Sequence, residues 1–343
     1  MCTHIKYAKK MKKFDRESYL IQNRENPLED DEHDDIKQQN IKQNLNRRTE
    51  DTSIDLPKQI TTAAAQTKMP LHELLLSSTL RTQMTTPNSS PVYAGWLQSG
   101  DWRTARALAY TFSVVVIDAE HGAIDLDQIA LCIEVMAGNN CQTIVRIPFT
   151  QDKRAAFARR CLDAGAIGIL APNIQSQEQA FAFIENCYFP TEKTPWGKRG
   201  YGYGGCNQDG NAFKEYAAVA NDRIIIGCQL EHKDAFEDNT LDDILSTPGL
   251  IFTQDGPYDH SGSYLVPGET SDPRVLADLK KYRAQCQKHN VVAGKHVVLP
   301  THENITQALQ AGYRFVAVGT DMLAVVQGSM ESMRALTSVT TDQ

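Results

Sequence analysis

Two carboxylates follow neighbouring apolar runs in the second half of the chain. Glu231 ends the run 223–231, Asp259 ends the run 250–259, and a helix-like segment, 238–249, lies between them. This order puts both acids at the carboxyl ends of neighbouring parallel strands, where the catalytic loops of a βα barrel gather. Two carboxylates there predict a hard oxygen site suited to Mg²⁺ or Mn²⁺. The alternative is two acids in unrelated loops.

Three ionisable residues follow an earlier apolar run. The segment 114–117 is Val-Val-Val-Ile, and Asp118, Glu120 and His121 come directly after it. A histidine beside carboxylates can be held in one tautomer and act as a general acid or base. The alternative is a loop histidine satisfied by local hydrogen bonds.

Two arginines are candidates for binding anions. Arg146 lies in the apolar run 142–148, and a buried guanidinium requires a protein carboxylate or a substrate oxygen. Arg199 lies in the long glycine-rich stretch 190–211. Loops of this length commonly act as lids or binding loops. Arg199 is therefore either an anion contact or a solvated side chain.

Apolar, β-branched runs alternate with helix-period segments from residue 92 onward. This alternation predicts an α/β fold, a (β/α)₈ TIM barrel. An open doubly wound sheet is the competitor, but no GxGxxG motif follows the first strand. The expected strands are 92–98, 113–118, 142–148, 167–172, 223–230, 250–253, 291–298 and 315–319. The expected helices are 102–110, 125–137, 152–164, 176–187, 239–246, 273–289 and 302–311.

The remaining segments flank this barrel. Residues 1–68 are charged and lack apolar periodicity, so we expect a disordered tail. Residues 69–91 are expected to form a short helix, at 70–83, and a linker. The barrel then occupies 92–334, and 335–343 form a C-terminal tail.

The composition of the chain argues against a nucleic-acid-binding protein and against a membrane-spanning one. A net charge of −7 over 343 residues argues against nucleic-acid binding. No apolar run approaches the roughly 20 residues of a membrane helix. The eight cysteines are scattered without a CxxC pair, which indicates reduced intracellular thiols. The acidic residues of the tail disfavour a mitochondrial transit peptide, so we expect a cytoplasmic protein.

Eight motifs, in order over about 92–333, resemble one known family. The chain is similar to the HpcH/HpaI family of class II, metal-dependent pyruvate aldolases, which includes a macrophomate synthase-like branch. The motifs are Asp118-Ala-Glu-His121, Val-Arg-Ile-Pro around Arg146, the segment 162–172, Lys198-Arg-Gly-Tyr-Gly202, Gln229-Leu-Glu231, Thr247-Pro-Gly249, the segment 256–261 and Val318-Gly-Thr-Asp321.

The resemblance implies a barrel of the phosphoenolpyruvate/pyruvate-binding type and a role for each matching residue. Glu231 and Asp259 would ligate Mg²⁺ or Mn²⁺, with Co²⁺ as a further option. His121, oriented by Asp118, would be the acid/base, and Arg146 would stabilise the enolate oxygen. The residues expected to line the substrate site are Gln229, Arg146, Gly256, Pro257 and Tyr258.

The implied reaction is cleavage of a 4-hydroxy-2-oxo acid to pyruvate, or a related 2-oxo acid, and an aldehyde. The alternatives are oxaloacetate decarboxylation, a CoA-thioester lyase of the citrate-lyase type, and an inactive barrel that serves as a scaffold. The lack of an obvious strand-end lysine weighs against a Schiff-base aldolase, with Lys295 as the one residue to watch.

The family also implies an assembly. Its barrels form hexamers, often by exchanging the last helix, here 321–334, and Asp163 would approach a neighbour's active site. Two departures stand out. One extra residue before Gly256 makes Asp255 a second candidate ligand. His232 and His260 replace the usual residues beside the metal ligands.

Overall fold

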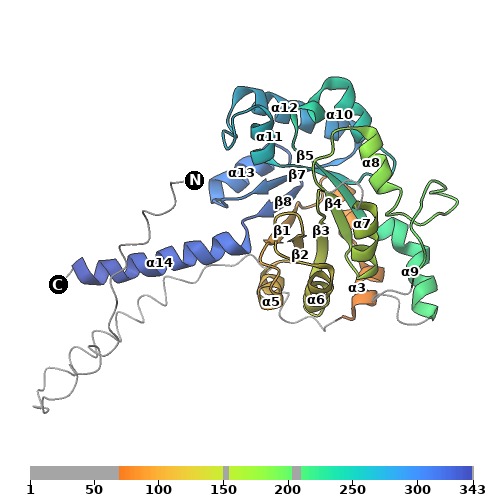
Figure 1. Cartoon of the computed structure of the whole chain (residues 1–343), viewed down its shortest axis with the longest axis horizontal. Helices are drawn as coiled ribbons and strands as arrows, with labels where there is room; N and C mark the ends of the chain where they lie inside the picture. Colours follow the sequence, from red (N-terminus) through yellow and green to blue (C-terminus); the bar gives the residue numbers. More distant parts are fainter. Residues whose placement is uncertain (1–68, 150–153, 203–209, 342–343) are drawn as a thin grey trace, which may run out of the picture. The chain divides into compact units, whose positions relative to one another are not determined.

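Eight parallel strands close into a barrel in the order β1 to β8, which confirms the predicted (β/α)₈ fold (Figure 1). The computed structural model describes residues 69–149, 154–202 and 210–341, all within one unit, Leu56–Gln343. The predicted disordered tail, 1–68, lies outside the described residues.

The strands overlap the eight expected runs, and β6 continues to Asp255, past the expected end at residue 253. Helices cover the outside of the barrel, so both faces of each strand are buried and the strands are almost continuously apolar. The strands are β1 (Val92–Leu97), β2 (Val114–Asp118), β3 (Gln142–Arg146), β4 (Gly168–Ala171), β5 (Ile225–Leu230), β6 (Phe252–Asp255), β7 (Val292–Val297) and β8 (Phe315–Val318).

Several helices begin at residues whose side chains cap them. Asp125 and Gln128 form a capping box at α6, and Asp272 caps α12 before Pro273. The helices are α3 (Leu71–Ser77), α4 (Leu80–Thr85), α5 (Trp102–Thr111), α6 (Leu126–Ala137), α7 (Arg154–Asp163), α8 (Gln177–Ile184), α9 (Gly210–Arg223), η3 (Lys233–Phe236), α10 (Asp238–Leu245), α11 (Pro257–Ser263), α12 (Pro273–His289), α13 (His302–Gln310) and α14 (Asp321–Thr341).

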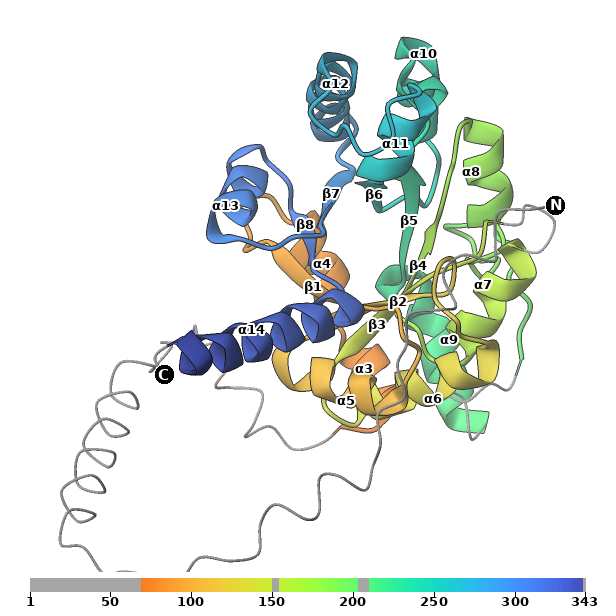
Figure 2. The ribbon, with the colours of Figure 1, turned by 60° about the vertical axis from the view of Figure 1, so that its left-hand side comes forward.

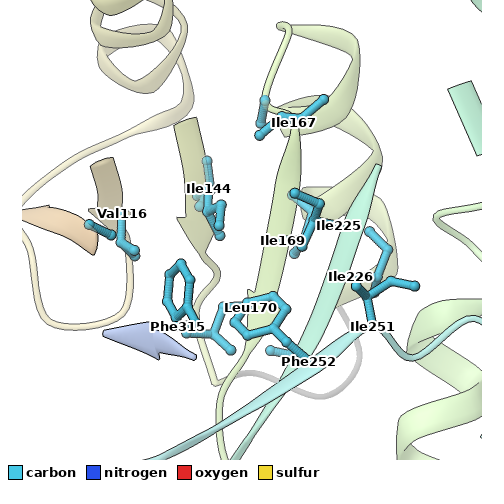
Figure 3. Close-up of a cluster of buried hydrophobic side chains, with 14 of the residues drawn as sticks. Val116, Ile144, Ile167, Ile169, Leu170, Ile225, Ile226, Ile251, Phe252 and Phe315 are labelled. Carbon is cyan, nitrogen blue, oxygen red and sulfur yellow. The ribbon is translucent and has the colours of Figure 1, made fainter. Parts of the chain in front are cut away.

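Packing in the barrel core fixes which way the side chains of β6 point. Phe252 and Phe315 pack at a ring distance of 5.0 Å (Figure 3). A Cβ on Gly227 would lie 2.2 Å from the Phe252 ring, so this position has no room for a side chain. Phe252 therefore points inward, and alternation along the strand turns Thr253 and Asp255 outward. The hydrogen bond of 2.9 Å between Thr253 and Tyr282 of α12 agrees with this.

The segment before the barrel differs from the expectation. Instead of one helix over 70–83, α3 and α4 are separated at Ser78 and Thr79. The Ser78 hydroxyl accepts from the backbone N–H of Leu80 (3.3 Å) and donates to Gln142 (2.8 Å). These bonds compete with the helical ladder. Both helices pack on the barrel unit, with Leu71 against Gly165 of the α7–β4 turn.

Helix α9 was not predicted from the sequence. The segment up to residue 211 was expected to be irregular, and no helix was expected before the strand at 223. Over 214–223, the buried positions include Tyr216 and Ala220. Because Ala220 is small, the apolar stripe is too weak to recognise by periodicity.

Helix α14 begins beside β1 and leaves the barrel, as Figures 1 and 2 both show. It continues to Thr341, past the expected end at residue 334. Its Asp321 side chain accepts hydrogen bonds from the backbone N–H groups of Gln98 and Ser99, at 2.8 and 3.0 Å. Large apolar side chains along the helix are exposed: Met322, Val325, Val326, Met330, Met333 and Leu336.

No helix among the described residues is long and apolar enough to cross a membrane.

Candidate functional site

A cavity of about 480 Å³ opens at the carboxyl ends of the strands. It brings together side chains from β1, β2, β3, β5, α11, β7 and the start of α14. Among the predicted site residues, those lining it are Asp118, His121, Arg146, Gln229, Gly256, Pro257, Tyr258 and Asp259.

Asp118 and Arg146 form a buried bidentate pair at the base of the cavity. Arg146 donates from Nε and Nη2 to the two oxygens of Asp118, at 3.0 and 2.7 Å. Its Nη1 lies 3.0 Å from Glu120 Oε2. Burial opposes ionisation of Asp118, but the hydrogen bonds and charge of Arg146 outweigh it and lower the pKa of Asp118. The guanidinium of Arg146 is thus charged and fixed in place.

His121 is exposed at the rim of the cavity. Asp118 contacts it through the backbone, since the N–H groups of Glu120 and His121 both donate to Asp118 Oδ1 at 3.1 Å. The carboxylate therefore orders the turn that carries His121, while its oxygens are shared with Arg146. Asp118 thus positions the backbone of His121 and, among the described residues, forms no hydrogen bond with its imidazole ring.

Glu231 is buried directly behind the cavity wall. Its Oε1 accepts from the backbone N–H of Asn173 at 2.7 Å, and its Oε2 has no hydrogen-bond partner among the described residues. A Cβ on Gly256 would lie 2.1 Å from that free oxygen and 2.6 Å from Gln229 Nε2. Burial, together with the charges of Glu120 and Asp259, raises the pKa of Glu231 to about 8.

Asp255 and Asp259 point to different sides of the barrel wall. Asp259, in the first turn of α11, lines the cavity. Asp255 points outward and contacts His260 Nδ1 at 3.1 Å, while Asp278 contacts His260 Nε2 at 3.2 Å. Burial opposes protonation of His260, but these two acids outweigh it and raise its pKa to about 9. His260 thus joins β6, α11 and α12.

Three other residues singled out in the sequence lie away from the cavity lining. Arg199 is buried and paired with Asp163 at 2.8 Å, so its anion is a carboxylate of the same chain. Asp163 itself is one-third exposed. His232 caps the short helix η3 through a contact of 3.4 Å with the backbone N–H of Asp234.

Comparison with known proteins identifies the family of this barrel. The family model described as HpcH/HpaI aldolase/citrate lyase matches residues 96–327. The chain belongs to the HpcH/HpaI aldolase/citrate lyase family.

Relatives in this family are aldolases by name. A hydroxypyruvate/pyruvate aldolase of Agrobacterium fabrum is 30% identical over 231 residues, which cover 66% of this chain and 82% of that protein. A 2-dehydro-3,6-dideoxy-6-sulfogluconate aldolase of Pseudomonas putida is 27% identical over 242 residues, covering 70% and 91%. The crystal structure of a family member from Burkholderia cenocepacia superposes with a TM-score of 0.69 and 24% identity, covering 76% and 99%, which supports the fold.

The oxygen donors at the cavity are compatible with a hard divalent cation. The described residues contain no cluster of three or more His, Cys, Asp or Glu side chains with metal-ligand geometry. The two acids, however, would leave positions open for substrate and water. Within the described part of the chain, Glu231 Oε2 and Gln229 Oε1 are buried without partners. A cation held by Glu231 and Asp259 would satisfy the free carboxylate oxygen.

The balance of acidic and basic side chains around Asp259 also favours a bound cation. Glu120 and Glu231 each interact with Asp259, and Arg146 and Arg154 interact with both glutamates. With Asp118 these make four acids against two guanidinium groups, so full ionisation of the acids would leave two uncompensated negative charges, and burial resists it by raising the pKa values of Glu120 and Glu231. A divalent cation would neutralise this excess.

Sequence reasoning missed three residues near this site. Trp96 donates to Asp118 Oδ2 at 3.2 Å and stacks on His296. Arg154 is buried, with Nε and Nη2 unpartnered among the described residues, and burial lowers its pKa. Only Trp96 carried a usable signal, an aromatic residue near the end of the first strand. The placement of His296 and Arg154 depends on tertiary packing.

Proposed function

We propose that the chain is a metal-dependent aldolase that cleaves a 4-hydroxy-2-oxo acid to pyruvate, or a related 2-oxo acid, and an aldehyde. The observation that carries this is the free, buried Oε2 of Glu231 behind Gly256, with Asp259 and Arg146 at the same cavity. Membership of a family whose relatives are named pyruvate and hydroxypyruvate aldolases supports the reaction class.

Glu231 and Asp259 would hold the cation, which we propose to be Mg²⁺ or Mn²⁺, with Co²⁺ as a substitute. When bound, it would supply Lewis-acid stabilisation of the charge that develops on the 2-oxo oxygen. Gly256 allows Glu231 to lie close to the cavity, because a side chain at position 256 would clash with the Glu231 carboxylate.

Arg146 would provide fixed positive charge for the same oxygen. Three of its roughly five N–H donors contact Asp118 and Glu120, which leaves about two for a ligand in the cavity. Because those contacts hold the guanidinium before substrate arrives, it needs no reorganisation during the reaction.

His121 would carry the proton of the substrate's 4-hydroxyl group. The imidazole lies on the exposed rim, so it can exchange that proton with solvent. Asp118 orders the backbone turn beneath it. In cleavage, the 4-hydroxyl would lose its proton to His121 while the C3–C4 bond breaks. The O–H electrons would form the aldehyde carbonyl at C4, and the electrons of the C3–C4 bond would form the enolate. Protonation of the enolate at C3 by solvent would then give the 2-oxo acid.

Oxaloacetate decarboxylation is the second candidate reaction, because it uses the same enolate. It needs no proton transfer from a 4-hydroxyl group. A His121→Ala variant should therefore lose aldol cleavage and keep decarboxylation. A Schiff-base route has less support, since no lysine is among the described residues lining the cavity. Lys295 shares the outward side of Asp255 in the strand register, with Nζ 5.4 Å from the Tyr313 ring.

A screen of pyruvate release tests the proposal. The full chain is assayed with 4-hydroxy-2-oxo acids and with oxaloacetate, with Mg²⁺ or Mn²⁺ and then with EDTA. We expect release that EDTA abolishes and added metal restores. A protein that binds no divalent cation and releases no pyruvate would instead be an inactive scaffold.

A further inference from the structure

His296 is a partly buried histidine at the same cavity, and it has no role in the mechanism above. It lies on β7 and lines the same cavity as Asp118, Arg146 and His121. Its ring stacks on Trp96 at 4.3 Å with an interplanar angle of 19°. Trp96 in turn donates to Asp118, and Arg146 lies 5.0 Å from the same indole. The indole of Trp96 therefore contacts both His296 and the guanidinium of Arg146, which is proposed to stabilise the enolate.

The contacts of His296 fix its tautomer. Nε2 lies 2.8 Å from the backbone carbonyl oxygen of Gly319. A carbonyl can only accept a hydrogen bond, so Nε2 must carry the proton. Burial, with the nearby charge of Arg146, lowers the pKa of His296 to about 4. The ring is therefore neutral near pH 7, and Nδ1 has a bare lone pair.

Nδ1 is free to accept a hydrogen bond from a molecule bound in the cavity. Among the described residues, the interaction with Gly319 is the only hydrogen bond of the imidazole. The carboxylate and oxo groups of a 2-oxo acid only accept hydrogen bonds, so they cannot pair with a bare imidazole nitrogen. A hydroxyl group is the substrate group that can donate to it.

We propose that His296 recognises a hydroxyl group of the substrate, which donates its proton in a hydrogen bond to Nδ1. The enzyme then prefers hydroxylated substrates to their deoxy counterparts. This inference rests on the proposed aldolase function and deepens it. The 4-carboxylate of oxaloacetate offers no donor, so His296 favours aldol substrates over decarboxylation.

Two substrate pairs test the proposal, with the metal-loaded full chain in the direction of synthesis. One pair compares hydroxypyruvate with pyruvate as donor for a common aldehyde. The other compares glycolaldehyde with acetaldehyde as acceptor for pyruvate. In each pair the quantity measured is the ratio of kcat/KM values, which cancels any loss that a variant inflicts on both substrates equally.

Two variants separate recognition from packing. His296→Phe keeps an aromatic ring on Trp96 and removes Nδ1, whereas His296→Asn places an amide oxygen near the position of Nδ1. We expect the phenylalanine variant to lower the hydroxyl preference by about tenfold in at least one pair, the size of one hydrogen bond. The asparagine variant should keep it within about threefold. A purely structural role would leave both ratios unchanged.

A preliminary measurement distinguishes failure of this inference from failure of the proposed function. Exchange of the pyruvate methyl protons in D₂O, followed by NMR, requires enolisation and no substrate hydroxyl. If the wild-type protein shows no metal-dependent exchange, the proposed function is wrong. If exchange occurs but the wild type has no hydroxyl preference, or His296→Phe leaves both ratios unchanged, only the role of His296 is overturned.

Discussion

At the scale of single residues, Asp118 organises the site by making several contacts at once. It accepts from Arg146, from Trp96 and from two backbone N–H groups of the following turn. A carboxylate with this many donors is held as an anion, and it fixes the positions of the groups around it. Within the described part of the chain, no hydrogen bond holds the side chain of His121, the residue proposed to move protons.

The metal ligands can be assigned by comparing three acids. Glu231→Gln or Asp259→Asn should weaken Mn²⁺ binding by roughly 100-fold or more, because one unit charge close to a cation contributes several kcal/mol in a partly buried site. Asp255→Asn is the matched control, since Asp255 points away from the cavity toward His260. Calorimetric titration with Mn²⁺ measures the effect. Loss of binding in the Asp255 variant alone would move the ligand assignment to that residue.

His296 also predicts how stability depends on pH. Its pKa is about 4 in the folded protein, below the ordinary histidine value of 6.5, so the unfolded chain binds the proton first as pH falls. Folding stability attributable to this group is constant above about pH 6.5 and declines between about 6.5 and 4, by up to about 3 kcal/mol. Compared with the wild type, His296→Phe should lose less stability across this window in urea denaturation. Parallel pH profiles for the two proteins would contradict the shifted pKa.

At the scale of elements, the site depends on how α11 meets β5. Gly256 precedes α11, and its missing side chain allows Glu231 and Gln229 to approach the cavity wall. Asp259 lies in the first turn of the same helix. The short connection from β6 into α11 thus brings the second proposed ligand to the first.

Adding one methyl group tests this arrangement. In Gly256→Ala, the new Cβ would lie 2.1 Å from Glu231 Oε2, so the carboxylate must move. We expect Mn²⁺ affinity and pyruvate release to fall by at least about tenfold. Gly262→Ala is the control within the same helix, because nothing lies within 4 Å of its Cβ position. Equal Mn²⁺ affinity and equal pyruvate release in the two variants would show that Glu231 does not depend on the missing side chain at Gly256.

The elements that sequence reasoning predicted, and those it missed, differ in their local signals. The strands β1 to β8 are buried on both faces, so they stand out as β-branched runs. Helix α9 buries a small residue, Ala220, and gave no periodic pattern. The break at Ser78 depends on a hydrogen bond to Gln142, which lies 64 residues away.

The same distinction holds for the site. Residues that leave strand ends, such as Glu231 and His121, could be identified from their place in the pattern. The side of the barrel wall to which Asp255 points could not be predicted from the sequence, because one additional residue in β6 makes the strand alternation ambiguous. The contact of Thr253 with Tyr282 in the structure resolves that ambiguity. His296 and Trp96 come from β7 and β1, and only closure of the barrel brings them together.

At the scale of the whole molecule, α14 presents an apolar stripe that the rest of the described chain leaves exposed. Met322, Val326, Met330 and Met333 recur at helical spacing, and each is about half exposed or more. Monomeric proteins rarely expose contiguous apolar surface of this kind, which is typical of interfaces. The resemblance described in the sequence analysis implies a hexamer, so we predict that the partner is a second copy of this chain.

We therefore expect a homo-oligomer that α14 holds together. The double variant Val325→Glu/Met333→Glu puts two charges on side chains that are 63% and 60% exposed in the single chain. Burying unpaired charges costs several kcal/mol, so the oligomer should dissociate toward monomers. Size-exclusion chromatography with light scattering measures the change. Ala335→Glu adds a charge to the same helix outside the stripe of Met322, Val326, Met330 and Met333, and it should leave the assembly intact. The start of α14 also lines the proposed active-site cavity through Met322 and Val326, so dissociation should lower turnover as well. A wild-type monomer, or a double variant that stays oligomeric, would show that α14 is not the interface.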